Sequence, residues 1–133
     1  MSGTDIVNQA SGELVTYDPV GPAELELMIR VLTDRLEASV PVLRTMWHDR
    51  YEAERALIEG RAKAMLSAKG ATVTEKRAEA DLASLPLRLE FDLKKEALHA
   101  GEELQKALTA KLYGLLNLNK AVTAAYQSYG HGR

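Results

Sequence analysis

Cysteine is absent from the 133-residue sequence, which excludes disulfide bonds, thiolate metal sites and a cysteine nucleophile. Only four prolines interrupt the chain, and no stretch alternates apolar and polar residues for the length that a buried strand needs. No apolar run approaches the roughly 20 residues that span a bilayer, and the N-terminus lacks the positive start and apolar core of a signal peptide. We therefore expect an all-α, cytoplasmic protein without membrane contact.

Each end of the chain lacks charge of one sign. Residues 1–29 contain no Lys or Arg, and residues 106–133 contain no Asp or Glu. The acids of the first stretch are Asp5, Glu13, Asp18, Glu24 and Glu26, and the bases of the last are Lys106, Lys111, Lys120 and Arg133. These ends form either two binding surfaces or two faces that meet within one fold, and the architecture predicted below favours the second.

A first amphipathic helix is predicted from Pro22, since proline at the first helical position loses no needed N–H. Its apolar residues recur at intervals of three and four, which is typical of one buried face: Leu25, Met28, Ile29, Leu32, Leu36 and Val40. Pro41 removes an N–H and disfavours helical geometry at Val40, so the helix either ends there or kinks. A second amphipathic segment then runs from Val42 to Lys69.

A tight turn is predicted at residues 70–73. Gly70 suits a helix C-terminus, and Thr72 followed by Glu75 provides a capping threonine and an early acid for the next helix. That helix extends from Thr74 to Ser128, with Pro86 predicting a kink or break near its start. Its main apolar row repeats every eleven residues, through Leu82, Leu93, Leu104, Leu115 and Tyr126.

The segments 22–69 and 74–128 have similar lengths, which predicts a long antiparallel helical hairpin, or else a three-helix bundle. The hairpin places residue i beside roughly residue 143 − i, so the acidic and basic ends meet. We expect a single helical domain over residues 22–128. Residues 1–21 form a flexible or extended leader with little regular structure, and residues 129–133 form a frayed tail.

A second apolar row lies beside the main one on the long helix. Two helices cannot bury both rows, so this row is the candidate surface for self-association or for a partner protein. Its members are Leu87, Phe91, Leu98 and Leu116. We expect a homo-oligomer that also binds another protein.

The residues needed for catalysis are missing. Glu96-x-x-His99 has the spacing of one half of a helix-bundle di-iron site, but no second pair accompanies it. No glycine-rich phosphate loop follows a strand, and no loop carries a nucleophile with a base. We therefore predict no catalytic residues, no metal and no cofactor, and assign the chain to the non-enzymes.

An aromatic and basic patch supports an alternative role in binding single-stranded nucleic acid by base stacking and phosphate contact. Trp47 and Tyr51 lie one helical turn apart, so they could instead pack on the long helix, and acids alternate with the arginines. The candidate contacts are Arg44, Trp47, Arg50, Tyr51, Lys120 and Arg133.

The run Gly60-Arg61-Ala62-Lys63-Ala64-Met65-Leu66-Ser67-Ala68-Lys69-Gly70, its charged, alanine-rich restart after Thr74 and the segment Leu116-Asn117-Leu118-Asn119 resemble small helical proteins of actinobacterial tailed phages. The resemblance covers about residues 50–120; the leader and Pro86 depart from it. It implies a non-catalytic accessory factor that acts on a recombination, replication or host protein in the host cytoplasm. A virion structural or assembly component is a further alternative.

Overall fold

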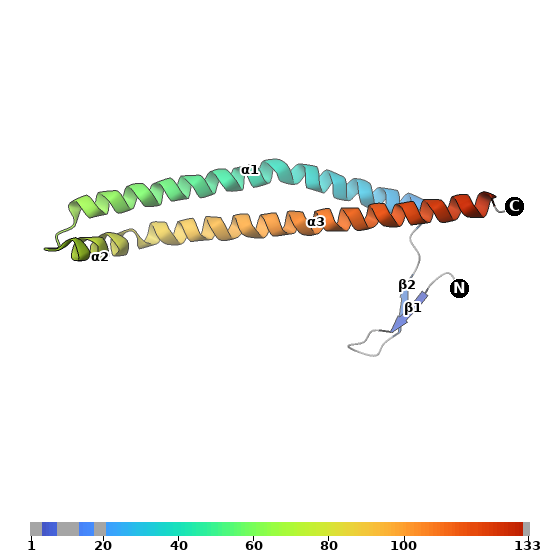
Figure 1. Ribbon diagram of the computed structural model, residues 1–133, viewed down its shortest axis with the longest axis horizontal. Helices are drawn as coiled ribbons and strands as arrows, with labels where there is room; N and C mark the ends of the chain where they lie inside the picture. The colour runs from blue at the N-terminus through green and yellow to red at the C-terminus, as the bar shows by residue number, and fades with distance from the viewer. Residues whose placement is uncertain (1–3, 8–13, 18–20, 132–133) are drawn as a thin grey trace. The chain divides into compact units, whose positions relative to one another are not determined.

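The computed structural model describes residues 4–7, 14–17 and 21–131. Three helices account for most of them: α1 (Pro22–Ser67), α2 (Val73–Ala83) and α3 (Leu85–His131) (Figure 1). Two short strands, β1 (Thr4–Val7) and β2 (Leu14–Tyr17), precede the helices. The prediction of an all-α fold built on a helical hairpin is confirmed for the body of the chain, and α3 continues to His131, past the predicted end at Ser128.

The strands correct, for residues 4–7 and 14–17, the expectation that residues 1–21 have little regular structure; residues 1–3, 8–13 and 18–20 of that leader lie outside the described residues. β1 and β2 pair antiparallel, with Thr4 opposite Tyr17 and Val7 opposite Leu14. Both segments contain β-branched residues, which favour strands, and Gly12 lies in the connection between them. Each run is only four residues long, too short for its alternation to be distinguished from a loop by sequence.

Helix α1 continues through Pro41, so Pro41 does not end it. Proline in a helix interior removes one backbone hydrogen bond and costs about 3 kcal/mol. The following turn remains helical, and Thr45 Oγ1 donates a hydrogen bond to the Pro41 carbonyl at 3.1 Å. The alternative in which a separate helix begins at Val42 is therefore wrong.

The predicted turn after α1 is confirmed, and its hydrogen bonds follow from the residues named above. Thr72 is the N-cap of α2, and its Oγ1 accepts a hydrogen bond from the Glu75 backbone N–H at 3.1 Å. The Glu75 carboxylate in turn accepts from the Ala71 N–H at 2.7 Å, a variant of the capping box in which the acid reaches the residue before the N-cap. Gly70 is required by close approach, because a Cβ there would lie 2.6 Å from the Glu75 Cβ.

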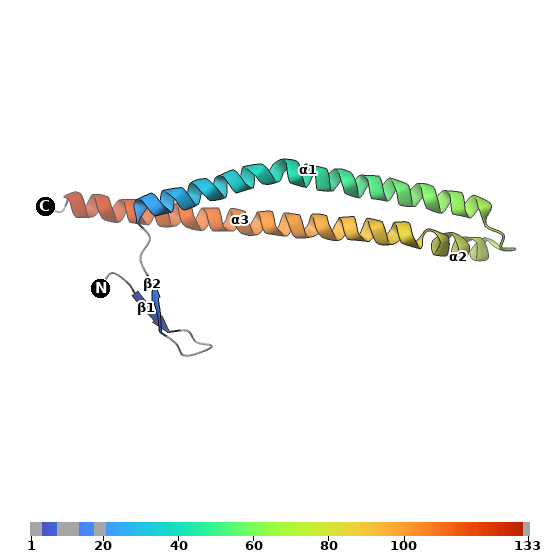
Figure 2. The same ribbon diagram turned by 180° about the vertical axis from the view of Figure 1, so that it is seen from behind.

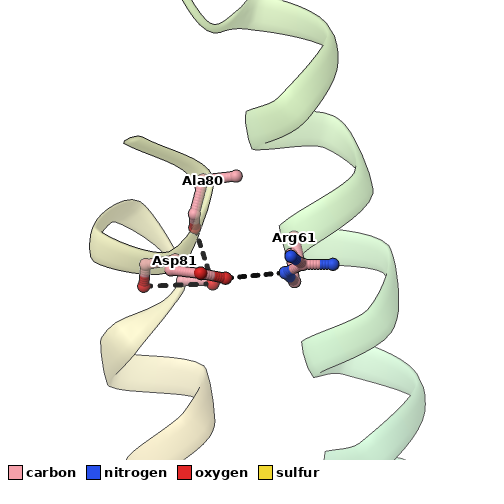
Figure 3. A network of polar contacts seen from close by, with 4 residues as sticks. Arg61, Ala80 and Asp81 are labelled. Carbon is pink, nitrogen blue, oxygen red and sulfur yellow. Dashed lines mark hydrogen bonds and ion pairs between the residues drawn. The ribbon is translucent and has the colours of Figure 1, made fainter. Parts of the chain in front are cut away.

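The break expected near Pro86 occurs at Ser84, between α2 and α3. Ser84 is almost fully buried, and both its N–H and its Oγ donate to the Ala80 carbonyl. Pro86 is the second residue of α3, where a backbone N–H has no helical partner to lose. Three residues before this break, Asp81 Oδ1 of α2 accepts a hydrogen bond from Arg61 Nε of α1 at 2.7 Å, as Figure 3 shows.

The chain forms two compact units. The turn unit consists of Arg35–Leu108, and the end unit of Met1–Asp34 with Thr109–Arg133. Within the turn unit, α1 and α3 run antiparallel (Figures 1 and 2). Gln105 Nε2 donates to Ser39 Oγ at 3.4 Å, and Gly101 adjoins Leu43 and Met46. These partners match the predicted hairpin register to within a few residues. Among the described residues, the end unit contains Glu24 and Glu26 of the acidic end together with Lys111 and Lys120 of the basic end, whereas Lys106 belongs to the turn unit.

The shielded positions of both helices recur with alternating steps of three and four, which is the heptad pattern of an antiparallel coiled coil. In the turn unit these positions in α1 are Leu36, Ser39, Leu43, Met46, Arg50, Ala53, Leu57, Gly60 and Ala64, and in α3 they are Leu87, Phe91, Lys94, Leu98, Gly101, Gln105 and Leu108. In the end unit they are Leu25, Ile29 and Leu32, with Leu112, Leu115, Asn119 and Val122. The predicted eleven-residue row is therefore wrong as the contact of the turn unit, where Leu82, Leu93 and Leu104 are exposed. In the end unit, Leu115 of that row is shielded but Tyr126 is exposed.

Candidate interaction surfaces

The side of α3 turned away from the heptad contact carries a continuous apolar row in the turn unit. We call this row the outer face of α3, and its members are Leu85, Leu89, Leu93, Ala97, Ala100 and Leu104. The four leucines are 47%, 56%, 59% and 51% exposed in that order, and both alanines are also exposed. Their spacing of three and four residues keeps all six on one side of the helix.

The second apolar row predicted as an interaction surface lies largely inside the molecule, so that prediction is wrong for three of its four residues. Phe91 and Leu98 are buried, at 9% and 3% exposure, and Leu87 is half-buried. The Leu87 side chain occupies the site where a Cβ of Gly60 would lie. Leu116, in the end unit, is 37% exposed and remains available.

The glycines explain why the second apolar row of α3, and not the predicted main row, contacts α1. Gly60 on α1 leaves space for Leu87, and Gly101 on α3 leaves space for Leu43 and Met46. A small residue opposite a large one lets two helices approach closely, as in ridges-into-grooves packing. The row beside these glycines therefore forms the contact, although the other row contains more leucine. Gly60 and Gly101 are the sequence features that could have identified this contact, but the prediction used only the spacing of apolar residues.

Charged residues border the outer face. Arg88 Nε lies 3.5 Å from Asp92 Oδ1, and Lys106 Nζ lies 3.4 Å from Glu103 Oε1, all on one edge with His99. On the other edge, Lys94 Nζ lies 3.5 Å from Glu90 Oε1. These are exposed pairs within a single helix, each worth less than about 1 kcal/mol. They leave the outer face apolar in its middle and charged at its rim.

The predicted aromatic and basic patch is partly assembled on α1. The Trp47 and Tyr51 ring centroids are 5.6 Å apart, and the Arg50 guanidinium lies 5.1 Å from the Trp47 ring centroid. Trp47 and Arg50 are half-buried, whereas Tyr51 and Arg44 are exposed. The Arg50 guanidinium is stacked on the Trp47 ring, so one face of that ring is already covered. Arg50 also occupies a heptad position.

Acidic residues reduce the positive charge around this cluster. Glu52 forms an ion pair with Arg55, and its Oε1 lies 3.9 Å from His48 Nε2. The hydrogen bond from Arg55 and its positive charge lower the pKa of the Glu52 carboxyl, so Glu52 stays ionised at neutral pH. Lys120 belongs to the end unit, where it is exposed, and Arg133 lies outside the described residues. Of the predicted nucleic-acid contacts, the structure shows Trp47, Arg50 and Tyr51 in contact with one another.

An open cleft at the break between α2 and α3 is lined by Leu57, Arg61, Asp81, Ser84, Leu85 and Arg88. Its two arginines could attract an anion, but Arg61 is paired with Asp81 and Arg88 with Asp92. Every buried side-chain nitrogen or oxygen in the described part of the chain has a hydrogen-bond partner. The cleft therefore contains no unpaired polar group that requires a ligand.

Over residues 4–7, 14–17 and 21–131, no three His, Asp or Glu side chains gather in a way that could hold a metal ion. None of the helices that these residues form has an apolar stretch long enough to cross a membrane. Fold and surface together define the class of protein as an antiparallel coiled-coil hairpin with an uncovered apolar helix face. Comparison with known proteins found no matching family model, no matching curated protein and no matching solved structure.

Proposed function

We propose that this protein is a non-catalytic helical interaction module whose working surface is the outer face of α3. The observation that carries the proposal is the position of the leucines on α3 in the turn unit: most of them lie on the exposed side of the helix and not on the side that contacts α1. Leu85, Leu89, Leu93 and Leu104 are about half exposed, whereas Phe91 and Leu98 face α1. A contiguous apolar patch rimmed by charge is the usual mark of a protein contact site in a water-soluble molecule.

The energetics favour coverage of this face. Apolar surface contributes about 25 cal/mol per Å² when it leaves water, so four half-exposed leucines along one helix represent a driving force of several kcal/mol for association. Folding of the hairpin does not use this surface, because the heptad positions already provide the contact between α1 and α3 in the turn unit. The face is therefore available for a second macromolecule.

The resemblance of residues 50–120 to small phage proteins supports an accessory role toward a recombination, replication or host protein. An assembly role in a virion is compatible with the same surface and would require large regular oligomers. In either case the protein acts by binding, without a catalytic residue or cofactor of its own.

Site-specific photocrosslinking tests the proposed surface. A benzophenone amino acid at Leu93, on the outer face, should give covalent protein adducts in the cells that naturally make the protein. The same amino acid at Ile58, which is equally exposed on α1 at 62%, is the matched control and should give few or none. Adducts of equal yield and identity from both positions, or none from Leu93, would contradict a working surface on α3.

Binding of single-stranded nucleic acid is the second candidate, supported by the stacked Arg50, Trp47 and Tyr51 side chains. If it holds, fluorescence anisotropy with a labelled oligonucleotide should show binding that weakens steeply with salt, because phosphate contacts release counterions. Replacing Arg44 by Gln should then weaken binding several-fold, whereas Arg77→Gln on α2 should not. Absence of binding at low salt would remove this candidate and leave the protein-contact role.

A further inference from the structure

We infer that the outer face of α3 binds a second copy of itself in antiparallel orientation, so that two hairpins join through α3 in a symmetric dimer. This inference rests on the proposed function, and it names the molecule that binds the proposed working surface. It follows from the order of large and small residues along the face and from the order of charges along its edge. All of the residues involved belong to the turn unit.

The first observation is the match between large and small side chains. When two α3 helices cross antiparallel about a two-fold axis near residue 95, Leu89 of one copy faces Ala100 of the other, and Leu93 faces Ala97. Leu85 faces Leu104 at either end. An isologous contact repeats each pairing twice, so the complementary row extends about 28 Å along the helices.

The parallel arrangement fits less well. In a parallel, in-register pair each residue meets its own copy, so leucine would meet leucine at 89 and 93 and alanine would meet alanine at 97 and 100. Helices separated by paired leucines would leave a gap at the paired alanines, and such gaps forfeit packing energy. Antiparallel pairing gives every central layer one leucine and one alanine, which allows a uniform close approach.

The second observation is the order of charge along one edge of the face, which reads Arg88, Asp92, Lys95, Glu96, His99 and Glu103 in sequence, with the two central residues of opposite charge. Antiparallel pairing about the same axis sets Arg88 of one copy beside Glu103 of the other. It also sets Asp92 beside His99, whose imidazole can donate a hydrogen bond to the carboxylate. Rim charges of this kind add little affinity, but they select one orientation over another.

The opposite edge offers no obstacle. Glu90 and Lys94 already form an ion pair within each helix, and beyond them Gly101 adjoins Leu43 and Met46 of α1. This edge therefore presents a paired charge, and not a lone one, to a second copy. The self-complementary order of the row, the edge charges and the neutral opposite edge together favour a second copy over an unrelated helix, which would need to match all three.

Sedimentation velocity on the full chain tests the association. The wild-type protein should shift from monomer to dimer between low and high micromolar concentration. Leu93→Glu should weaken the dimer by about 100-fold or more, because it buries an unpaired charge. Ile58→Glu, equally exposed but on α1, should leave the dimer constant within about two-fold, and circular dichroism should show that both variants remain helical.

Disulfide crosslinking tests the orientation, since the chain has no cysteine of its own. We expect Leu89→Cys and Ala100→Cys, each oxidised alone, to stay uncrosslinked, and an equimolar mixture of the two to form a disulfide-linked dimer. The two positions lie eleven residues apart, about 16 Å along the helix, so only antiparallel pairing brings them together. A parallel dimer would crosslink each variant alone.

Each outcome decides one of the two proposals. A wild-type chain that stays monomeric, a dimer unaffected by Leu93→Glu, or crosslinks within single variants would overturn the antiparallel α3 contact. If the chain is monomeric while the photocrosslinker at Leu93 labels a different protein, the interaction role survives and only its occupant changes. If the chain is monomeric and the crosslinker labels nothing, both proposals fail.

Discussion

Replacing Leu98 by alanine should lower the free energy of unfolding by about 2–5 kcal/mol. Leu98 is 3% exposed at a heptad position of α3 in the turn unit, so truncation both loses its burial and leaves a cavity. Leu93→Ala, on the outer face of the same helix, should change the stability of the monomer by no more than about 0.5 kcal/mol. Urea unfolding followed by circular dichroism gives both values.

The comparison requires a protein concentration at which sedimentation shows monomer, because any dimer contact would add its own contribution at Leu93. The two substitutions remove the same atoms from the same helix, so helix propensity cancels between them. A larger loss for Leu93→Ala than for Leu98→Ala would mean that the eleven-residue row, and not the heptad row, contacts α1.

Replacing Gly101 by leucine should lower the free energy of unfolding by about 1–3 kcal/mol through overpacking. A Cβ at Gly101 would already lie 3.1 Å from Leu43 Cδ2 and 3.1 Å from Met46 Sδ, and a leucine adds further atoms in the same direction. Gly114 of the same helix has no atom within 4 Å of the equivalent position. Gly114→Leu should therefore raise stability by about 0.5–1 kcal/mol from helix propensity alone.

Thermal and urea unfolding of this glycine pair separate packing from propensity, since both substitutions carry the same propensity gain. Opposite signs for the two variants would establish that Gly101 is kept small by the neighbouring helix. Stabilisation by both substitutions would mean that Leu43 and Met46 move aside at little cost, and that the approach of α1 and α3 is set elsewhere.

The aromatic cluster could be anticipated from sequence only in part. One helical turn separates Trp47 from Tyr51, so the sequence placed both in one patch, but their ring contact at 5.6 Å was not predicted. The position of Arg50 over the Trp47 ring and its place among the heptad positions depend on where α3 lies. Sequence also grouped Lys120 with these residues, although Lys120 belongs to the end unit.

The local elements were determined by the sequence itself, because their causes are short-range. Pro22 begins α1, Thr72 and Glu75 cap α2, and Pro86 follows the break at Ser84. Each of these acts through hydrogen bonds or backbone angles within about four residues. The antiparallel register followed from the position of the turn, since a tight turn at residues 70–73 sets residues equally far from it side by side.

The choice between two apolar faces of α3 was decided by tertiary structure alone. Both rows have helical periodicity, so spacing within one helix cannot distinguish them. The contact depends on both helices together, because Gly60 and Gly101 each make room for a large side chain of the opposite helix. Shape complementarity across the pair thus placed Phe91 and Leu98 inside and left Leu89 and Leu93 on the outer face, where a second molecule can cover them.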